Sequence, residues 1–339
     1  MRNKTGIILV SILAIVAITV IVIGQHNFTN TQFAISSVDV NEPEEEQTIS
    51  PDKIYVYGLN ENIDIYVKGS NEESQNYIGY HVRHLEKSID TSEISSNYDV
   101  WKINGASEYL RNKSNDFRLV QKVVRSGEWE MALYERGATD FVGGSAHGDE
   151  ITTSVEAFID GKKVALDEFI DTEADEFVLS TVSDVYRDNT ITAELELIAE
   201  HHKTYTFNKD GLQLEQEVIF KEDLLWFRPY LSMLPILRTN DGGQVTDTYE
   251  VNDETFDVSE EGFGEQRFEA EKASIWSEES GITATVEITD KSLDIPSIFH
   301  IYDSPNYNKM YFAYTYDDFQ VSSGDSWKQT TQYVIDTSN

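Results

Sequence analysis

The sequence predicts a mostly β protein, a large antiparallel β-sandwich preceded by an N-terminal transmembrane helix. Three observations predict the sandwich. Apolar and polar residues alternate over many short segments, β-branched and aromatic residues are frequent in those segments, and helical periodicity is rare between them. Strands that follow one another without intervening helices favour antiparallel sheets packed face to face over a doubly wound α/β fold.

The N-terminus predicts a membrane segment. Arg2 and Lys4 precede an uncharged apolar run over residues 6–24. As a helix this run is about 28 Å long, close to the hydrocarbon thickness of a bilayer. The apolar region of a cleavable signal is usually shorter, so we expect residues 1–25 to be a retained anchor, with an exported, cleaved signal as the alternative. Because no Lys or Arg follows until Lys53, the rest of the chain should face outward from the cell membrane.

The membrane segment is followed by a linker and then by the main domain. Residues 26–52 are polar and include the run Asn41–Glu46, which is typical of a solvated acidic tether. Residues 53–339 are predicted to form the β-sandwich domain. Its first section, 53–124, is less regular and richer in Asn and Ser, so a small separate N-terminal module is the alternative.

Strand patterning is clearest at residues 151–159, where Ile151, Val155, Ala157 and Ile159 share one face. Asp160-Gly161 and Asp210-Gly211 are typical of tight hairpin turns. Short helices are expected at 106–112 and 166–170. The other predicted strands are 190–197, 203–207, 212–220, 282–288 and 309–316.

Composition excludes several classes of function. The chain has 61 acidic and 26 basic residues, and 24 of the basic residues follow the anchor, so the outer part carries 24 − 61 = −37 charges. This charge repels nucleic acid and anionic lipid, and it argues mildly against a long polyanionic substrate, although a local cleft can hold Arg and Lys against it. The absence of cysteine excludes disulfides, thiolate metal sites and cysteine nucleophiles. No nucleotide-binding motif is present.

The stretch 140–150, DFVGGSAHGDE, is the first candidate for catalysis. Its glycines let the backbone bend, and in an extended segment His147 and Asp149 lie on one face while Glu150 points the other way. An imidazole near neutral pKa moves protons, and a neighbouring acid raises its basicity. We therefore predict His147, Asp149 and Glu150 as catalytic residues. In the alternative, the acids bind turn amides and the histidine packs at a sheet edge.

Two further segments supply candidate substrate contacts. Arg136 either neutralises an acid group of the substrate or pairs with a nearby carboxylate. The run 226–230, WFRPY, combines a cation with aromatic rings that stack on a sugar, which makes Trp226, Arg228 and Tyr230 candidates. The alternative places Trp226 or Phe227 in the core. Alternation upstream predicts that Trp129 is a core residue.

No motif requires a cofactor, but the sequence leaves calcium binding as an open question. Asn240-Asp241-Gly242-Gly243 with Asp247 beyond offers oxygen ligands, although it lacks the full EF-hand spacing. A plain turn is the alternative reading of this segment.

The segment 202–235 resembles the galactose-mutarotase-like super-sandwich found in sugar epimerases, polysaccharide lyases and carbohydrate-binding modules. The blocks 127–130 (GEWE) and 140–150, which contain HGDE, resemble exported and phage-tail-associated bacterial proteins. Together the resemblances cover about two thirds of the chain. The histidine-glycine blocks of aldose epimerases are matched only at Gly143, Gly144 and His147, so mutarotase activity itself is not expected. The lyase resemblance implies His147 as base and Arg228 as the group that stabilises a uronate carboxylate.

These observations predict an extracellular, carbohydrate-directed protein that is either lyase-like or glycan-binding. Its partner would be a polysaccharide or cell-wall glycan. Whether it is an enzyme stays open. The alternative is a non-catalytic envelope scaffold that binds another protein and shows no glycan affinity.

Overall fold

In a computed structural model of the chain the described residues are 50, 52–70, 75–87, 98–112, 116–188, 196–240, 243–258, 266–304 and 307–337. Within these ranges the chain is mostly β, as predicted, with one four-residue helix, α2 (Gly144–His147). The strands are β1 (Ile54–Leu59), β2 (Asn62–Lys68), β3 (Asn76–Lys87), β4 (Tyr98–Arg111), β5 (Phe117–Val124), β6 (Glu150–Ile159), β7 (Lys162–Val164), β8 (Ile170–Ala174), β9 (Phe177–Tyr186), β10 (Leu197–Asn208), β11 (Gly211–Phe220), β12 (Leu224–Phe227), β13 (Tyr230–Leu237), β14 (Thr239–Asn240), β15 (Gly243–Gln244), β16 (Thr248–Val251), β17 (Glu254–Asp257), β18 (Arg267–Glu269), β19 (Lys272–Trp276), β20 (Ile282–Lys291), β21 (Ile298–Asp303), β22 (Tyr307–Ala313), β23 (Asp318–Val321) and β24 (Ser326–Thr337).

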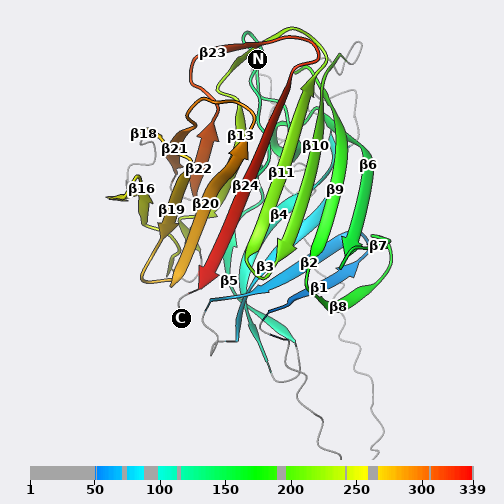
Figure 1. Cartoon of the computed structure of the whole chain (residues 1–339). Coiled ribbons are helices and arrows are strands. Elements are labelled where there is room, and N and C mark those ends of the chain that lie inside the picture. The colour runs from blue at the N-terminus through cyan, green and yellow to red at the C-terminus, as the bar shows by residue number, and fades with distance from the viewer. Residues whose placement is uncertain are drawn as a thin grey trace, which may run out of the picture. The chain divides into compact units, whose positions relative to one another are not determined.

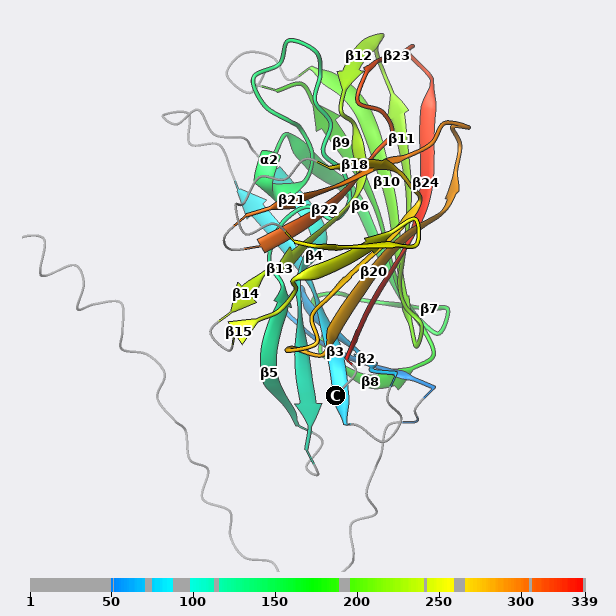
Figure 2. The ribbon, with the colours of Figure 1, turned by 90° about the vertical axis from the view of Figure 1, so that its left-hand side faces the viewer.

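The strands form two packed layers, which confirms the expected sandwich-like arrangement of a large sheet. One layer has the antiparallel order β20, β24, β11, β10, β9, β6, and it faces the viewer in Figure 1. The other layer has the order β1, β2, β3, β4, β5, β13, β22, β21. In Figure 2 its strands β4, β5, β13, β22 and β21 lie to the left of β10, β11 and β24 of the first layer. A parallel pairing of β4 with β6 connects the two layers at one edge. Strands β1–β5 thus belong to the same 20-stranded sheet as the later strands.

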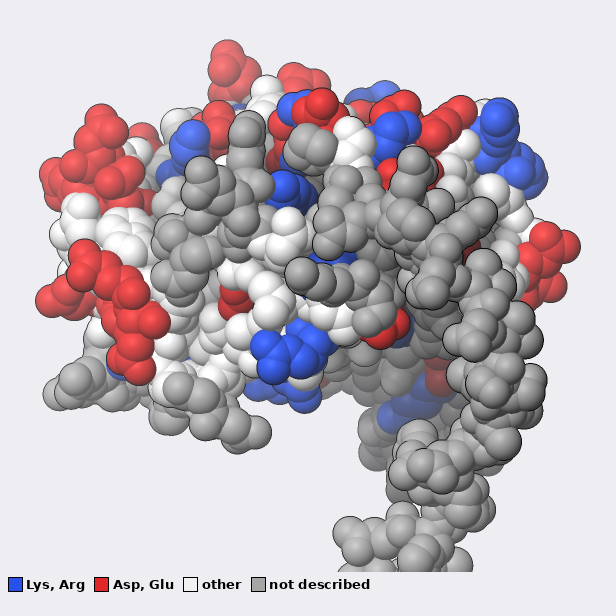
Figure 3. Space-filling view, turned by 90° about the horizontal axis from the view of Figure 1, so that it is seen from below, with Lys and Arg blue, Asp and Glu red and all other residues white. Residues whose placement is uncertain are grey.

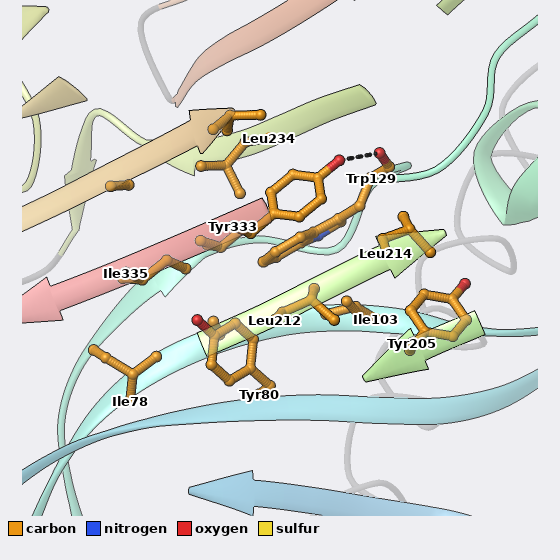
Figure 4. Close-up of a cluster of buried hydrophobic side chains, with 14 of the residues drawn as sticks. Ile78, Tyr80, Ile103, Trp129, Tyr205, Leu212, Leu214, Leu234, Tyr333 and Ile335 are labelled. Atoms are coloured by element: carbon orange, nitrogen blue, oxygen red, sulfur yellow. Dashed lines mark hydrogen bonds between the residues drawn. The ribbon is translucent and has the colours of Figure 1, made fainter. Parts of the chain in front are cut away.

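The hydrophobic core lies between the layers and is rich in aromatic rings. Figure 4 shows Tyr80 and Ile103 from one layer and Leu214 and Tyr333 from the other, with Trp129 among them. Trp129 is completely buried, as its alternation pattern predicted, and its carbonyl accepts a hydrogen bond of 2.9 Å from the Tyr333 hydroxyl. Burying each such ring stabilises the fold by about 1.5–3 kcal/mol.

Local sequence signals predicted several elements correctly. The segment 151–159 lies within β6, 203–207 within β10, 212–220 within β11 and 282–288 within β20. Asp160 and Gly161, with φ of 48° and 72°, form the tight turn from β6 to β7. Most of the predicted strand 190–197 lies outside the described residues, and the one predicted at 309–316 ends at Ala313.

The two predicted helices are wrong. Residues 106–111 belong to β4, whose two edges pair with β3 and β5, so the sheet overrides the local helical pattern. Residues 166–169 form a turn, and Ile170 begins β8, which pairs with β1.

The predicted anchor at 6–24 and nearly all of the linker lie outside the described residues. Among the residues that are described, no helix has the length and apolar character needed to cross a bilayer.

Candidate functional site

The glycine-rich stretch places His147 at the end of α2 with a quarter of its side chain exposed. Gly143 and Gly144, with φ of 120° and 64°, bend the chain into this helix. The His147 Nδ1 atom lies 3.4 Å from Oδ1 of Asp140, and the ring lies 5.1 Å from that of Phe141. Burial lowers the pKa of His147 despite the nearby carboxylates, so its imidazole is mainly neutral at pH 7 and able to accept a proton.

Glu150 is enclosed and makes structural contacts. Its carboxylate accepts hydrogen bonds from Lys203 Nζ at 2.7 Å, His201 Nδ1 at 3.2 Å and the Gly144 amide at 2.6 Å. Burial opposes the charge of Glu150, but Lys203 and His201 hold its pKa well below the usual range. Glu150 therefore anchors the start of α2 to β10.

The segment around Asp149 is not extended, because residues 144–147 form α2 and Asp149 adopts a positive φ of 59°, so the alternation expected to put His147 and Asp149 on one face is absent. The carboxyl is buried, and its Oδ1 has no hydrogen-bond partner among the described residues. Burial, together with the charges of Asp188 and Asp140, raises the pKa of Asp149 to about 7. The carboxylate beside His147 is that of Asp140.

Two of the residues predicted to contact a substrate, Trp226 and Arg136, pack or pair with other residues of the domain. Trp226 is completely buried and packs against Phe220, with ring centroids 5.8 Å apart. Arg136 is exposed, forms an ion pair with Asp318 and lies 4.2 Å above the ring of Phe227. Trp226 is therefore a core residue and Arg136 forms a surface ion pair, which are the alternatives that the sequence left open for these two residues.

Arg228 and Tyr230 lie together in a group that we call the arginine–aromatic cluster. Register explains its assembly, because His300 on β21 is directly opposite both Arg267 on β18 and Tyr311 on β22, which puts the three on one face. The Tyr311 ring stacks on His300 at 4.8 Å and lies 4.7 Å from that of Tyr230. The members of the cluster are Arg228, Tyr230, Arg267, His300, Tyr311 and Tyr316.

Both arginines of the cluster lie against the ring of Tyr316, Arg267 at 3.9 Å and Arg228 at 5.1 Å from its centroid. The Tyr316 hydroxyl is hydrogen-bonded to Nδ1 of His300. Burial and the two guanidinium charges lower the pKa of His300 to about 3, so this imidazole is neutral. The Nε atom of Arg228 is buried with no hydrogen-bond partner among the described residues.

Lys309 extends the same face towards α2. Its Nζ lies 4.8 Å from the centroid of the Tyr311 ring, and burial lowers its pKa to about 8 although Glu128 favours the charge. Glu128 is buried, bonded to Lys102 Nζ at 2.9 Å, and accepts a hydrogen bond of 2.6 Å from the amide of Ala146 in α2.

A continuous row of rings joins the predicted histidine to the cluster. The ring centroid of Phe141 lies 5.1 Å from that of His147 and 6.0 Å from that of Tyr230. The Tyr230 ring in turn contacts the rings of Tyr311 and His300. In Figure 2, α2 lies on the same side of the domain as β21, β22 and β13. The structure thus brings together three of the predicted residues: His147, Arg228 and Tyr230.

Sequence reasoning missed Arg267, His300, Tyr311, Tyr316 and Lys309. The one local signal was the alternation of Tyr, Lys and Tyr at positions 307, 309 and 311, which puts polar and aromatic side chains on the strand face opposite Met310 and Phe312.

This arrangement offers flat rings and two guanidinium groups, which can bind a ring-shaped ligand with an anionic group, and the neutral imidazole of His147, which can accept a proton. Within the described ranges, no group of three His, Asp or Glu side chains is arranged to hold a metal ion. In the segment considered for calcium, Asn240 pairs with Gly243, and residues 241–242 lie outside the described part.

Comparison with known proteins gives no family. No protein-family model matches the sequence, and no curated protein matches it. Similar solved structures include a galactose mutarotase-like protein from Clostridium acetobutylicum, with 10% identity, a TM-score of 0.40 and coverage of 85% of this chain and 100% of that one. An aldose 1-epimerase candidate from Klebsiella pneumoniae has 7% identity, a TM-score of 0.38 and coverage of 86% and 90%. A 4-alpha-glucanotransferase from Thermococcus litoralis has 10% identity, a TM-score of 0.37 and coverage of 83% and 39%. Similarity at these values assigns no family, so function has to be argued from the side chains.

Proposed function

We propose that this chain binds an acidic carbohydrate at the arginine–aromatic cluster. The partly exposed rings of Tyr311 and Tyr316 present flat apolar area of the kind that packs against the C–H face of a sugar. Arg228 and Arg267 present forked donors whose geometry matches a carboxylate.

The observation that carries this proposal is the state of Arg228. Its φ of 54° is strained for a residue with a side chain, and its guanidinium lies over Phe227 and Tyr316, with Nε unsatisfied among the described residues. No described carboxylate pairs with this half-buried guanidinium, and a bound carboxylate would supply its counter-charge. An acidic sugar is therefore favoured over a neutral one.

Calorimetric titration of the full chain with galacturonic acid and with galactose tests this proposal. We expect tighter binding of the acid, and we expect Arg228→Gln and Arg267→Gln each to weaken it about tenfold while leaving the weaker binding of galactose unchanged. Lys209→Gln, an exposed cation in the turn between β10 and β11, is the matched charge control and should change nothing. Equal affinity for the two sugars, or no binding of either, would refute the proposal.

A second candidate function, β-elimination on a uronate, is favoured by the neutral imidazole of His147, which can take the proton, and by the Tyr316 hydroxyl beside the two guanidiniums, which burial keeps protonated and able to give a proton to the departing oxygen. In this reaction the base takes the proton next to the carboxylate, a carbon–carbon double bond forms, and the departing sugar oxygen leaves with a proton. Tyr316→Phe should abolish the ultraviolet absorption of the unsaturated product while binding persists. Absence of such absorption over a panel of polyuronates would leave binding as the function.

We also propose that residues 6–24 hold the domain at the outer face of the cell membrane. The support is the apolar run with Arg2 and Lys4 on its N-terminal side. A protease added to intact cells should then degrade the domain. A chain that is protected until the cells are lysed would exclude this location. A protein partner in crosslinking without any glycan affinity would favour the scaffold alternative.

A further inference from the structure

The face that carries the cluster continues along β22. Tyr307, Lys309 and Tyr311 occupy alternate positions, so their side chains share one side of the strand, while Met310 and Phe312 point into the core. Opposite Lys309 lies Tyr302 of β21, on the same side. At about 3.3 Å per residue, the four residue steps from Tyr307 to Tyr311 cover about 13 Å, which is longer than one sugar ring.

A second cationic hollow adjoins the far end of this row. The Arg125 guanidinium lies 4.6 Å over the ring of Tyr307, and Leu237, which is directly opposite Tyr307 in register, lines the hollow. The volume is about 480 Å³, within the range typical of ligand pockets.

Among the described residues, the lining of this hollow contains no carboxylate, although the chain has 61 acidic residues. Lys122 and Arg125 supply positive charge, and the Asn104 amide with the Ser107 and Ser126 hydroxyls supplies hydrogen-bonding groups. Figure 3, which views the molecule from below, shows that Lys and Arg side chains also gather locally elsewhere on the surface, while most of the Asp and Glu drawn there lie towards the edges of the view. The hollow is therefore suited to an anionic, hydroxyl-rich group.

We infer that the ligand is a linear oligosaccharide with acidic groups on several of its units, bound along β22 from this hollow to the arginine–aromatic cluster. The inference rests on the proposed function and adds the size and charge pattern of the ligand. Cations lie at both ends of the row and rings lie between them, so a monosaccharide reaches only one end. A longer acidic chain reaches both and passes over Tyr307, Lys309 and Tyr311.

The net charge of −35 does not prevent such binding. At physiological ionic strength the screening length is about 8 Å, so distant carboxylates contribute little at the point of contact, while Arg125, Lys309 and Arg228 act directly. The global charge slows the approach of a polyanion, and the local cations determine how tightly it is held.

The test is a titration of the full chain with galacturonate oligomers, from the monosaccharide to the hexasaccharide. Affinity should increase with length until both ends are engaged. The double variant Lys122→Ala/Arg125→Ala should weaken the hexasaccharide about tenfold or more and leave the monosaccharide unchanged. The charge-matched control Lys162→Ala/Lys209→Ala removes two exposed cations at hairpin turns and should leave both unchanged. Circular dichroism of each variant checks that it is folded.

The outcomes separate this inference from the proposed function. If the monosaccharide binds and the hexasaccharide binds no more tightly, the cluster binds a single acidic sugar and the inference is wrong. If the double variant weakens every length equally, the hollow is not a distal subsite, and the inference again fails. If no acidic sugar of any length binds, the proposed function fails with it.

Discussion

At the scale of single residues, Asp149 is held where its charge is unfavourable. Burial and two neighbouring acids raise its pKa to about 7, so the folded chain binds a proton there that the unfolded chain has released above about pH 4. The stability contributed by this protonated group is complete at low pH and is lost as the pH rises towards 7. We predict that Asp149→Asn raises the free energy of unfolding by roughly 1–3 kcal/mol at pH 8 and has little effect at pH 4.

Asn suits this position because it tolerates the positive φ of 59° better than most residues. Urea unfolding of both chains at pH 4, 6 and 8 measures the effect. Asp175→Asn, at an acid with an exposed side chain, is the control and should show no comparable gain. A gain of the same size at every pH would mean that the Asp149 carboxyl is ionised in the folded chain throughout this range.

At the scale of elements, two glycines with positive φ give a matched comparison. A Cβ atom at Gly144 would lie 2.7 Å from Cγ and Oε1 of Glu128, whereas a Cβ atom at Gly161 would meet nothing within 4 Å. Both alanine variants lose about 1–2 kcal/mol of stability, because a side chain disfavours a left-handed backbone. Gly144→Ala should lose more and should also weaken sugar binding, because Glu128 cannot move without breaking its bonds to Lys102 and Ala146. Thermal unfolding and calorimetric titration of both variants measure these effects. Unchanged binding in Gly144→Ala would separate α2 from the ligand site.

The elements also show what the sequence can and cannot predict. Period-2 alternation predicted β6, β11 and β20 because each strand has one face in the core and one outside it. The same rule missed residues 106–111, where pairing on both edges of β4 outweighs a helical pattern. The arginine–aromatic cluster could not be predicted from the sequence for a related reason. Its members meet through the pairing of β18, β21, β22 and β13, and that register is set by contacts between residues far apart in the chain. The sequence singles out His147 because glycines mark a local bend, whereas nothing beside His300 in the sequence marks its position.

At the scale of the whole molecule, the excess of 35 negative charges opposes the folded state, because folding brings the carboxylates closer together. Ion pairs on the surface, such as Lys163 with Glu156 and Lys272 with Glu287, act in the other direction but contribute about 0–1 kcal/mol each. Salt screens both effects, and its net influence shows which of them is larger.

We predict that the repulsion is larger, so that added salt stabilises the domain. The screening length falls from about 30 Å at 0.01 M salt to about 8 Å at 0.15 M. Added salt therefore weakens the many long-range repulsions between carboxylates more than it weakens the short contacts within ion pairs. Thermal unfolding of the full chain should therefore occur at a higher temperature as sodium chloride increases over this range. Urea is the right denaturant for a parallel titration, because guanidinium chloride would itself screen the charges. A lower unfolding temperature in salt would show that the paired charges outweigh the unpaired acidic excess.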